Sequence, residues 1–169
     1  ARPSRLIDST GNTQGIRFST MPPTSASARA AHSPRLAPAT AGAAGDAALQ
    51  RALRDFYEAQ GRADVGRWLP GYLSDLPRTP RRIVFKRTST QWGSLAPDST
   101  LALDLALVLA RPSAFEYVLV HELCHLLHAD HSRRFWREVE ARWPGWREER
   151  DYLRGDGLAL KGRLARLIR

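Results

Sequence analysis

The feature that most constrains this chain is the segment His121–His125, which sets two histidines and a glutamate inside an apolar run. Histidines four residues apart lie about 40° apart around an α-helix and one turn up, so both imidazoles reach one point. Glu122 follows the first histidine, where its carboxylate can approach a metal-bound water without taking a ligand position. This HExxH motif therefore predicts two zinc ligands and a general base.

The surrounding sequence favours a helix here. Ser113 and Glu116 have the spacing of a capping box, so we expect the helix to begin after Ser113 and to run to about His128. Residues 115–127 are mostly apolar, and a charged side chain such as Glu122 is seldom buried without a partner or a function. A functional metal site is therefore favoured over an exposed cluster of His and Glu.

A catalytic zinc site needs a third protein ligand, and two histidines compete for that place. On an unbroken helix His128 would lie about 20° from His121, whereas His131 would lie about 120° away. His131 reaches the metal only if the helix breaks, and Asp130 and Ser132 are residues that favour turns and caps. We predict that His131 is the third ligand and that His128 borders the site. If the helix instead continues, His128 replaces His131.

Composition divides the chain into three stretches. Residues 1–45 are rich in Ala, Ser, Pro and Thr and are predicted to hold a hairpin remnant and a flexible segment. Residues 46–154 have the periodicity of a folded domain, and residues 155–169 read as a basic amphipathic tail. Strands are expected at 83–86, 88–95 and 100–103, and helices from Asp46, at 65–73, after Ser113, after Ser132 and at 146–154.

The chain is basic, with 26 Lys and Arg against 17 Asp and Glu and a formal net charge of +9. This balance suits a polyanionic partner such as nucleic acid, but it also arises where arginine simply fills polar surface positions. Because no base-reading motif occurs, nucleic-acid binding is the secondary interpretation. The residues that would contact phosphates in that case are Arg78, Arg81, Arg82, Lys86 and Arg87.

The single cysteine, Cys124, excludes an intramolecular disulfide and predicts a cytoplasmic location. No apolar run is long enough to span a membrane, so no transmembrane segment is expected. Neither observation predicts an oligomeric state.

Three separated motifs carry a family resemblance. Residues 117–136 combine the metal helix with the pair His131-Ser132, Gln91-Trp92-Gly93-Ser94 lies upstream, and residues 144–150 open a downstream helix. In this order they resemble the YgjP-like metal-dependent hydrolases, small zincin-fold proteins related to SprT-like proteases. The resemblance covers about residues 46–154. Leu95 departs from the cysteine that is common in the family.

The resemblance implies an α+β, zincin-like fold, in which a small antiparallel or mixed sheet packs on the metal-binding helix and further helices follow. It implies Zn²⁺ held by His121, His125 and His131. Gln91, Trp92, Gly93 and Ser94 are expected on an edge strand that binds an extended peptide by strand addition, although Trp92 also suits a core position.

The predicted function is a zinc metallopeptidase that acts on a peptide or protein substrate, with Glu122 as general base. The alternatives are a nucleic-acid-associated protease of SprT-like type and a metal-binding interaction domain with little catalytic activity. Arg150 and Tyr152 follow the metal region, but the sequence assigns neither of them to the transition state.

Overall fold

The computed structural model describes residues 43–168. The predicted hairpin remnant and most of the flexible segment therefore lie outside the described residues. The helices are α1 (Ala43–Trp68), α2 (Pro112–Cys124), α3 (Arg133–Arg142) and α4 (Trp146–Leu167), and the strands are β1 (Arg82–Lys86), β2 (Gly93–Leu95) and β3 (Thr100–Asp104).

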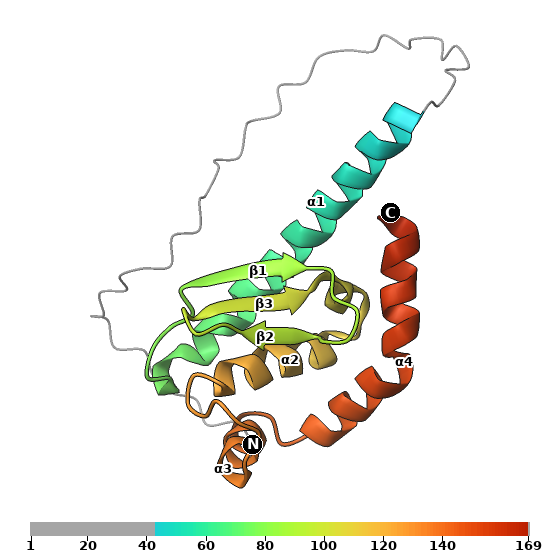
Figure 1. Ribbon diagram of the computed structural model, residues 1–169. Coiled ribbons are helices and arrows are strands. Elements are labelled where there is room, and N and C mark those ends of the chain that lie inside the picture. The colour runs from blue at the N-terminus through green and yellow to red at the C-terminus, as the bar shows by residue number, and fades with distance from the viewer. Residues whose placement is uncertain (1–42, 169) are drawn as a thin grey trace, which may run out of the picture. The chain divides into compact units, whose positions relative to one another are not determined.

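The three strands form a mixed sheet in the order β1-β3-β2 (Figure 1). β1 runs parallel to β3, with Arg82 opposite Thr100, whereas β2 runs antiparallel to β3, with Gly93 opposite Leu103. The α+β class with a small mixed sheet is confirmed. The predicted strand at 88–95 is shorter than expected, because residues 88–92 form the loop that leads into β2. β2 is an edge strand of this sheet.

The core lies between the sheet and the helices behind it (Figure 1). Leu101 and Leu103 of β3 are fully buried, as are Leu119 and Leu123 of α2. Burying each such side chain contributes about 1.5–3 kcal/mol. α2 is therefore held along its apolar faces, which fixes the direction in which its polar side chains point.

Helix α2 begins and ends earlier than predicted. Arg111, not Ser113, is the N-cap residue, because Pro112 occupies the first helical position, where its missing N–H costs nothing. The helix ends at Cys124 rather than His128. Beyond it the backbone tightens, with Leu127 N and His128 N both donating to the Cys124 carbonyl at 3.0 Å.

Two other helices differ from the predicted pattern. The expected helix at 65–73 is the end of α1 followed by two 3-10 turns, Leu69–Gly71 and Leu73–Asp75, because Pro70 cannot continue the α-helix. α4 continues without a break through the segment predicted as a tail, and Leu160, Leu164 and Ile168 are buried there. The predicted cap of α3 is confirmed, since Ser132 Oγ accepts from Phe135 N at 3.5 Å. No helix in residues 43–168 is long and apolar enough to cross a membrane.

Candidate metal centre

Three histidine rings converge beside the C-terminal end of α2. His121 comes from this helix, His125 is its C-cap residue and His131 comes from the turn before α3; one ring nitrogen from each lies within 4.8 Å of the others. The Nε2 atoms of His121 and His131 are 3.0 Å apart. Nitrogens that share one zinc ion at 2.0–2.1 Å in tetrahedral geometry would be about 3.3 Å apart, so these donors fit a single ion.

The end of α2 brings His131 to this point. Asp130 Oδ1 accepts from Ser132 N at 3.3 Å, and this turn leads into α3. His128 is placed differently, because its backbone carbonyl accepts a hydrogen bond from His125 Nδ1 at 3.0 Å. A carbonyl can only accept, so His125 carries its proton on Nδ1 and leaves Nε2 free for a metal. Among the described residues the His128 ring is not part of the cluster.

The environment keeps the histidines of α2 neutral, which metal binding requires. Burial, with the adjacent His125 and His131, lowers the pKa of His121 to about 3. Burial also lowers the pKa of His125. The Phe135 ring stacks on His125 with ring centroids 4.5 Å apart and meets His131 at 4.7 Å, so one aromatic side chain of α3 supports both rings.

Glu122 is buried between α2 and the edge strand, with 5% of its surface exposed. A Cβ atom built on Gly93 would lie 2.6 Å from both Cγ and Oε1 of Glu122, so only glycine leaves room for this carboxyl group. Burial raises the pKa of Glu122 to about 8. The Trp-Gly-Ser motif and the HExxH motif, far apart in sequence, therefore form one site.

A cavity of about 780 Å³ opens over the histidines and Glu122. Its walls come from α2, from β2 with its flanking loops, and from α4, and the four predicted substrate-binding residues all line it. These residues are Gln91, Trp92, Gly93 and Ser94. Tyr117 also lines the cavity, and burial raises its pKa to about 12, so its hydroxyl keeps its proton at neutral pH.

Trp92 lies both in the wall of the cavity and against the hydrophobic core. Its ring lines the cavity and also packs on α4, where a Cβ atom on Gly157 would approach it to 2.7 Å. Lys161 Nζ lies 4.5 Å from the ring centroid, a favourable cation–π contact. The indole therefore links the edge strand to the last helix.

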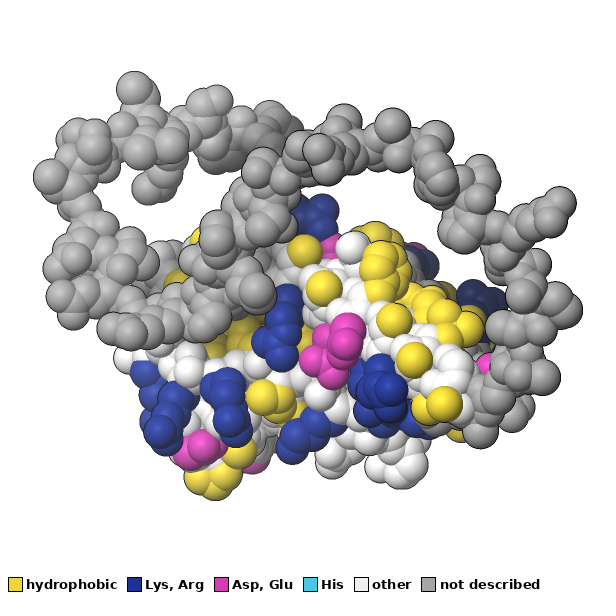
Figure 2. Space-filling view, turned by 90° about the horizontal axis from the view of Figure 1, so that it is seen from above, with side chains coloured by type: hydrophobic (Ala, Val, Ile, Leu, Met, Phe, Trp, Pro, Cys, Tyr) yellow, Lys and Arg dark blue, Asp and Glu magenta, His cyan; other side chains and the backbone are white. Residues whose placement is uncertain are grey.

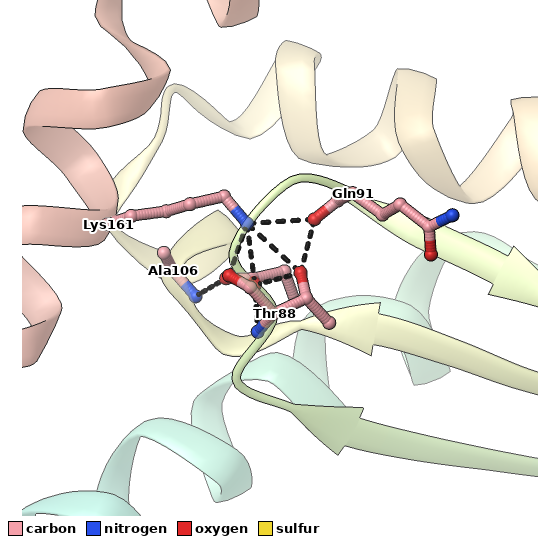
Figure 3. Close-up of polar contacts among 5 residues, drawn as sticks. Thr88, Gln91, Ala106 and Lys161 are labelled. Carbon is pink, nitrogen blue, oxygen red and sulfur yellow. Dashed lines mark hydrogen bonds and ion pairs between the residues drawn. The ribbon is translucent and has the colours of Figure 1, made fainter.

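A partly buried polar cluster around Asp104 fixes the loop that precedes β2, and sequence reasoning missed it (Figure 3). Lys161 reaches from α4 to the Asp104 carboxylate at 2.8 Å and to the Gln91 carbonyl at 2.8 Å. Asp104 also accepts from Thr88 N and Thr88 Oγ1 at 2.8 and 2.6 Å, and from Ala106 N at 2.8 Å. A buried ion pair is tolerable when its remaining hydrogen-bonding groups are satisfied in this way. The only sequence signal was that Lys161 is one of two lysines among 26 basic residues.

Comparison with known proteins identifies the family. The chain matches the YgjP-like metallopeptidase domain over residues 15–156. It belongs to this family. The match starts before residue 46, where the sequence resemblance began, and makes the chain a metallopeptidase-type hydrolase. The metallopeptidase zymogen of Pyrococcus abyssi abylysin is a similar solved structure, with 24% identity and a TM-score of 0.42 over 59% of this chain and 90% of that chain. Comparison with curated proteins gives no match.

Proposed function

We propose that this YgjP-like chain is a zinc-dependent endo- or exopeptidase whose metal is held by His121, His125 and His131. The observation that carries the proposal is the convergence of three imidazoles beside a buried carboxyl group in the wall of a cavity. Imidazole nitrogens are common zinc ligands, and a catalytic zinc site uses three protein ligands and leaves a fourth position open for water. Glu122 lies beside these ligands and is free to act on that water.

The chemistry divides between the metal and Glu122. Zinc, when bound, lowers the pKa of a coordinated water toward about 7 and polarises the scissile carbonyl. Glu122 accepts the proton of the attacking water and passes it to the leaving amine. Burial already disfavours the charged form of this carboxylate, so its proton affinity lies in the range that both steps need.

The substrate is proposed to bind as an added strand. β2 pairs with β3 on one side only, and residues 91–97, which contain β2, line the cavity. An extended peptide could therefore hydrogen-bond to the free edge of β2 and present its backbone to the metal. Since backbone groups make these bonds, recognition along β2 would tolerate many sequences.

A direct test is hydrolysis of an unstructured protein by the zinc-loaded chain, followed by mass spectrometry of the fragments. We expect cleavage that stops when a chelator removes the metal and resumes when Zn²⁺ is added back. Absence of cleavage by the fully zinc-loaded chain across unstructured proteins of varied composition would contradict a peptidase and favour the metal-binding interaction domain.

Nucleic-acid binding stays the secondary candidate. Of the arginines considered for phosphate contacts, Arg78 lines the metal cavity and Arg87 donates to the Ile168 carbonyl at 3.0 Å. On the face seen in Figure 2, Lys and Arg side chains form separate groups with hydrophobic and acidic side chains between them. This distribution does not favour a continuous phosphate-binding surface.

We also propose a cytoplasmic location, consistent with the free, buried thiol of Cys124.

A further inference from the structure

The charged groups around the candidate metal cavity are unbalanced. Among the described residues, three arginines, Arg78, Arg150 and Arg154, line it together with a single carboxyl group, that of Glu122. Because the histidines are neutral ligands, a bound divalent metal would add further positive charge. A cleft of one sign with low-dielectric walls attracts ligands of the opposite sign.

Arg154 lies 3.8 Å from Asp151, whereas Arg78 and Arg150 have no acidic partner in residues 43–168, and of these two it is Arg150 that lies over aromatic rings. No ion pair in this part of the chain includes it, and its Nε atom is buried without a hydrogen bond. Two other arginines are paired. Arg111 bonds Glu149 at 2.8 Å, and Arg147 bonds Glu140 at 3.0 Å.

The sequence of α4 explains why Arg150 is left unpaired. The positions one turn away on the helix, where an acidic residue would form an intrahelical pair, hold Trp146, Arg147, Leu153 and Arg154. Its neighbour Glu149 is engaged by Arg111. Because Arg150 lines the cavity and no described carboxylate pairs with it, an anion that enters the cavity would complete this site.

Aromatic rings hold the Arg150 guanidinium in place. It lies 5.0 Å from the Trp146 ring centroid and 5.7 Å from that of Trp136, and these two rings stack at 4.3 Å. Trp136 in turn lies 5.7 Å from the His131 ring. A planar guanidinium fixed on aromatic faces is arranged in advance for bidentate contact with a carboxylate.

We propose that Arg150 forms a carboxylate-binding subsite beside the scissile bond, so that the enzyme prefers peptides that carry an acidic group next to the cleaved bond. This inference rests on the proposed peptidase function and names its substrate class. The carboxylate comes from an acidic side chain or from the C-terminus of the peptide. Both sources offer the same two oxygens to the guanidinium.

The test uses the zinc-loaded full chain and one cleaved peptide in four versions. The residue next to the observed cleavage point is Glu or Gln, and the C-terminus is a free acid or an amide. We expect kcat/KM to be about 10- to 100-fold higher for versions with a carboxylate, as one charge-assisted pair of hydrogen bonds provides. The Glu and Gln versions report the side chain, and the acid and amide versions report the C-terminus.

Arg150→Gln is expected to abolish this preference while leaving the zinc content within about twofold. Arg150→Lys keeps the charge but lacks the planar fork, so it should retain only part of the preference. The matched control is Arg147→Gln on the same helix, whose arginine is paired and does not line the metal cavity among the described residues. It should keep the full preference.

Binding separates this inference from the peptidase proposal. The fluorescence anisotropy of labelled Glu and Gln peptides is measured with the zinc-loaded Glu122→Gln chain, with and without Arg150→Gln. Tighter binding of the carboxylate peptide that disappears with Arg150→Gln supports the subsite even if no peptide is cleaved. The subsite proposal is overturned if the unmodified chain binds and cleaves all four peptides equally well. It is also overturned if the preference for a carboxylate survives Arg150→Gln. If Arg150→Gln does not hold zinc, the comparison of peptides on the unmodified chain and on Arg150→Lys decides.

Discussion

Glu122→Gln is expected to lower kcat/KM for peptide hydrolysis by about 10²- to 10⁴-fold, the contribution of a positioned general base. Glutamine has nearly the shape of glutamate and fits beside Gly93, but its amide cannot accept the proton of the attacking water. Zinc content should be unchanged, since the three histidines are the proposed metal ligands. Steady-state kinetics on a cleaved peptide, with zinc measured on the same samples, check both statements.

Glu116→Gln is the matched control for this substitution. Glu116 lies on the same helix, but its carboxylate accepts from the Tyr72 hydroxyl at 2.8 Å, away from the histidines. Activity should survive this change. Near-normal activity in Glu122→Gln would show that another group moves the proton, and loss of zinc would show that Glu122 supports the metal instead.

The same substitution has a second consequence for the metal-free protein. Burial raises the pKa of Glu122 from 4.5 to about 8, so between these pH values the native state keeps a proton that the unfolded chain releases. Stability of the metal-free chain therefore falls as pH rises through this interval. Glu122→Gln removes this titration. Thermal unfolding in chelator should show a smaller loss of stability from pH 5 to pH 8 in the variant than in the unmodified chain.

Gly93→Ala is expected to cost about 100-fold in kcat/KM, the order of effect seen when a catalytic group is displaced by about 1 Å. The added Cβ would lie 2.6 Å from Cγ and Oε1 of Glu122, so either the carboxyl group or β2 must move. Both are parts of the proposed machinery. The change should lower kcat more than zinc content, because the three atoms nearest the added methyl group all belong to Glu122 and not to a histidine.

Gly155→Ala provides the control for Gly93→Ala. Gly155 lies within α4, and a Cβ atom there would meet nothing within 4 Å among the described residues. Alanine favours the helix by about 1 kcal/mol over glycine, so this variant should be as active as the unmodified chain and slightly more stable. Equal activity of Gly93→Ala and Gly155→Ala would contradict the close fit of Glu122 against β2.

Local patterns explain which parts of the site were predictable. The HExxH spacing fixes His121, Glu122 and His125 within one turn of helix, and turn-forming Asp130 with the cap residue Ser132 pointed to a break that brings His131 near. The structure places the three ring nitrogens together and uses His128 through its carbonyl. Each of these signals depends on neighbours within a few residues.

The remainder depends on contacts that no local pattern encodes. The parallel pairing of β1 with β3 requires β2 to pass to the far edge of the sheet, and strand propensity does not specify partners. Lys161 and Asp104 are 57 residues apart, and the role of Gly93 appears only when Glu122 packs on it. Residues 155–169 were predicted to be a separate amphipathic tail from their own composition. In the structure α4 continues to Leu167, and Leu164 and the C-cap residue Ile168 are buried against the rest of the fold.

The measurement that tests the central claim most directly is elemental analysis of zinc in the unmodified chain, His131→Ala and His128→Ala, prepared side by side. The structure predicts about one zinc per chain in the unmodified protein and in His128→Ala, whose backbone carbonyl can still orient His125. His131→Ala should lose most of its zinc, because a nitrogen 3.0 Å from His121 Nε2 is removed. Zinc retained without His131 but lost without His128, or no zinc in the unmodified chain after reconstitution, would contradict the site.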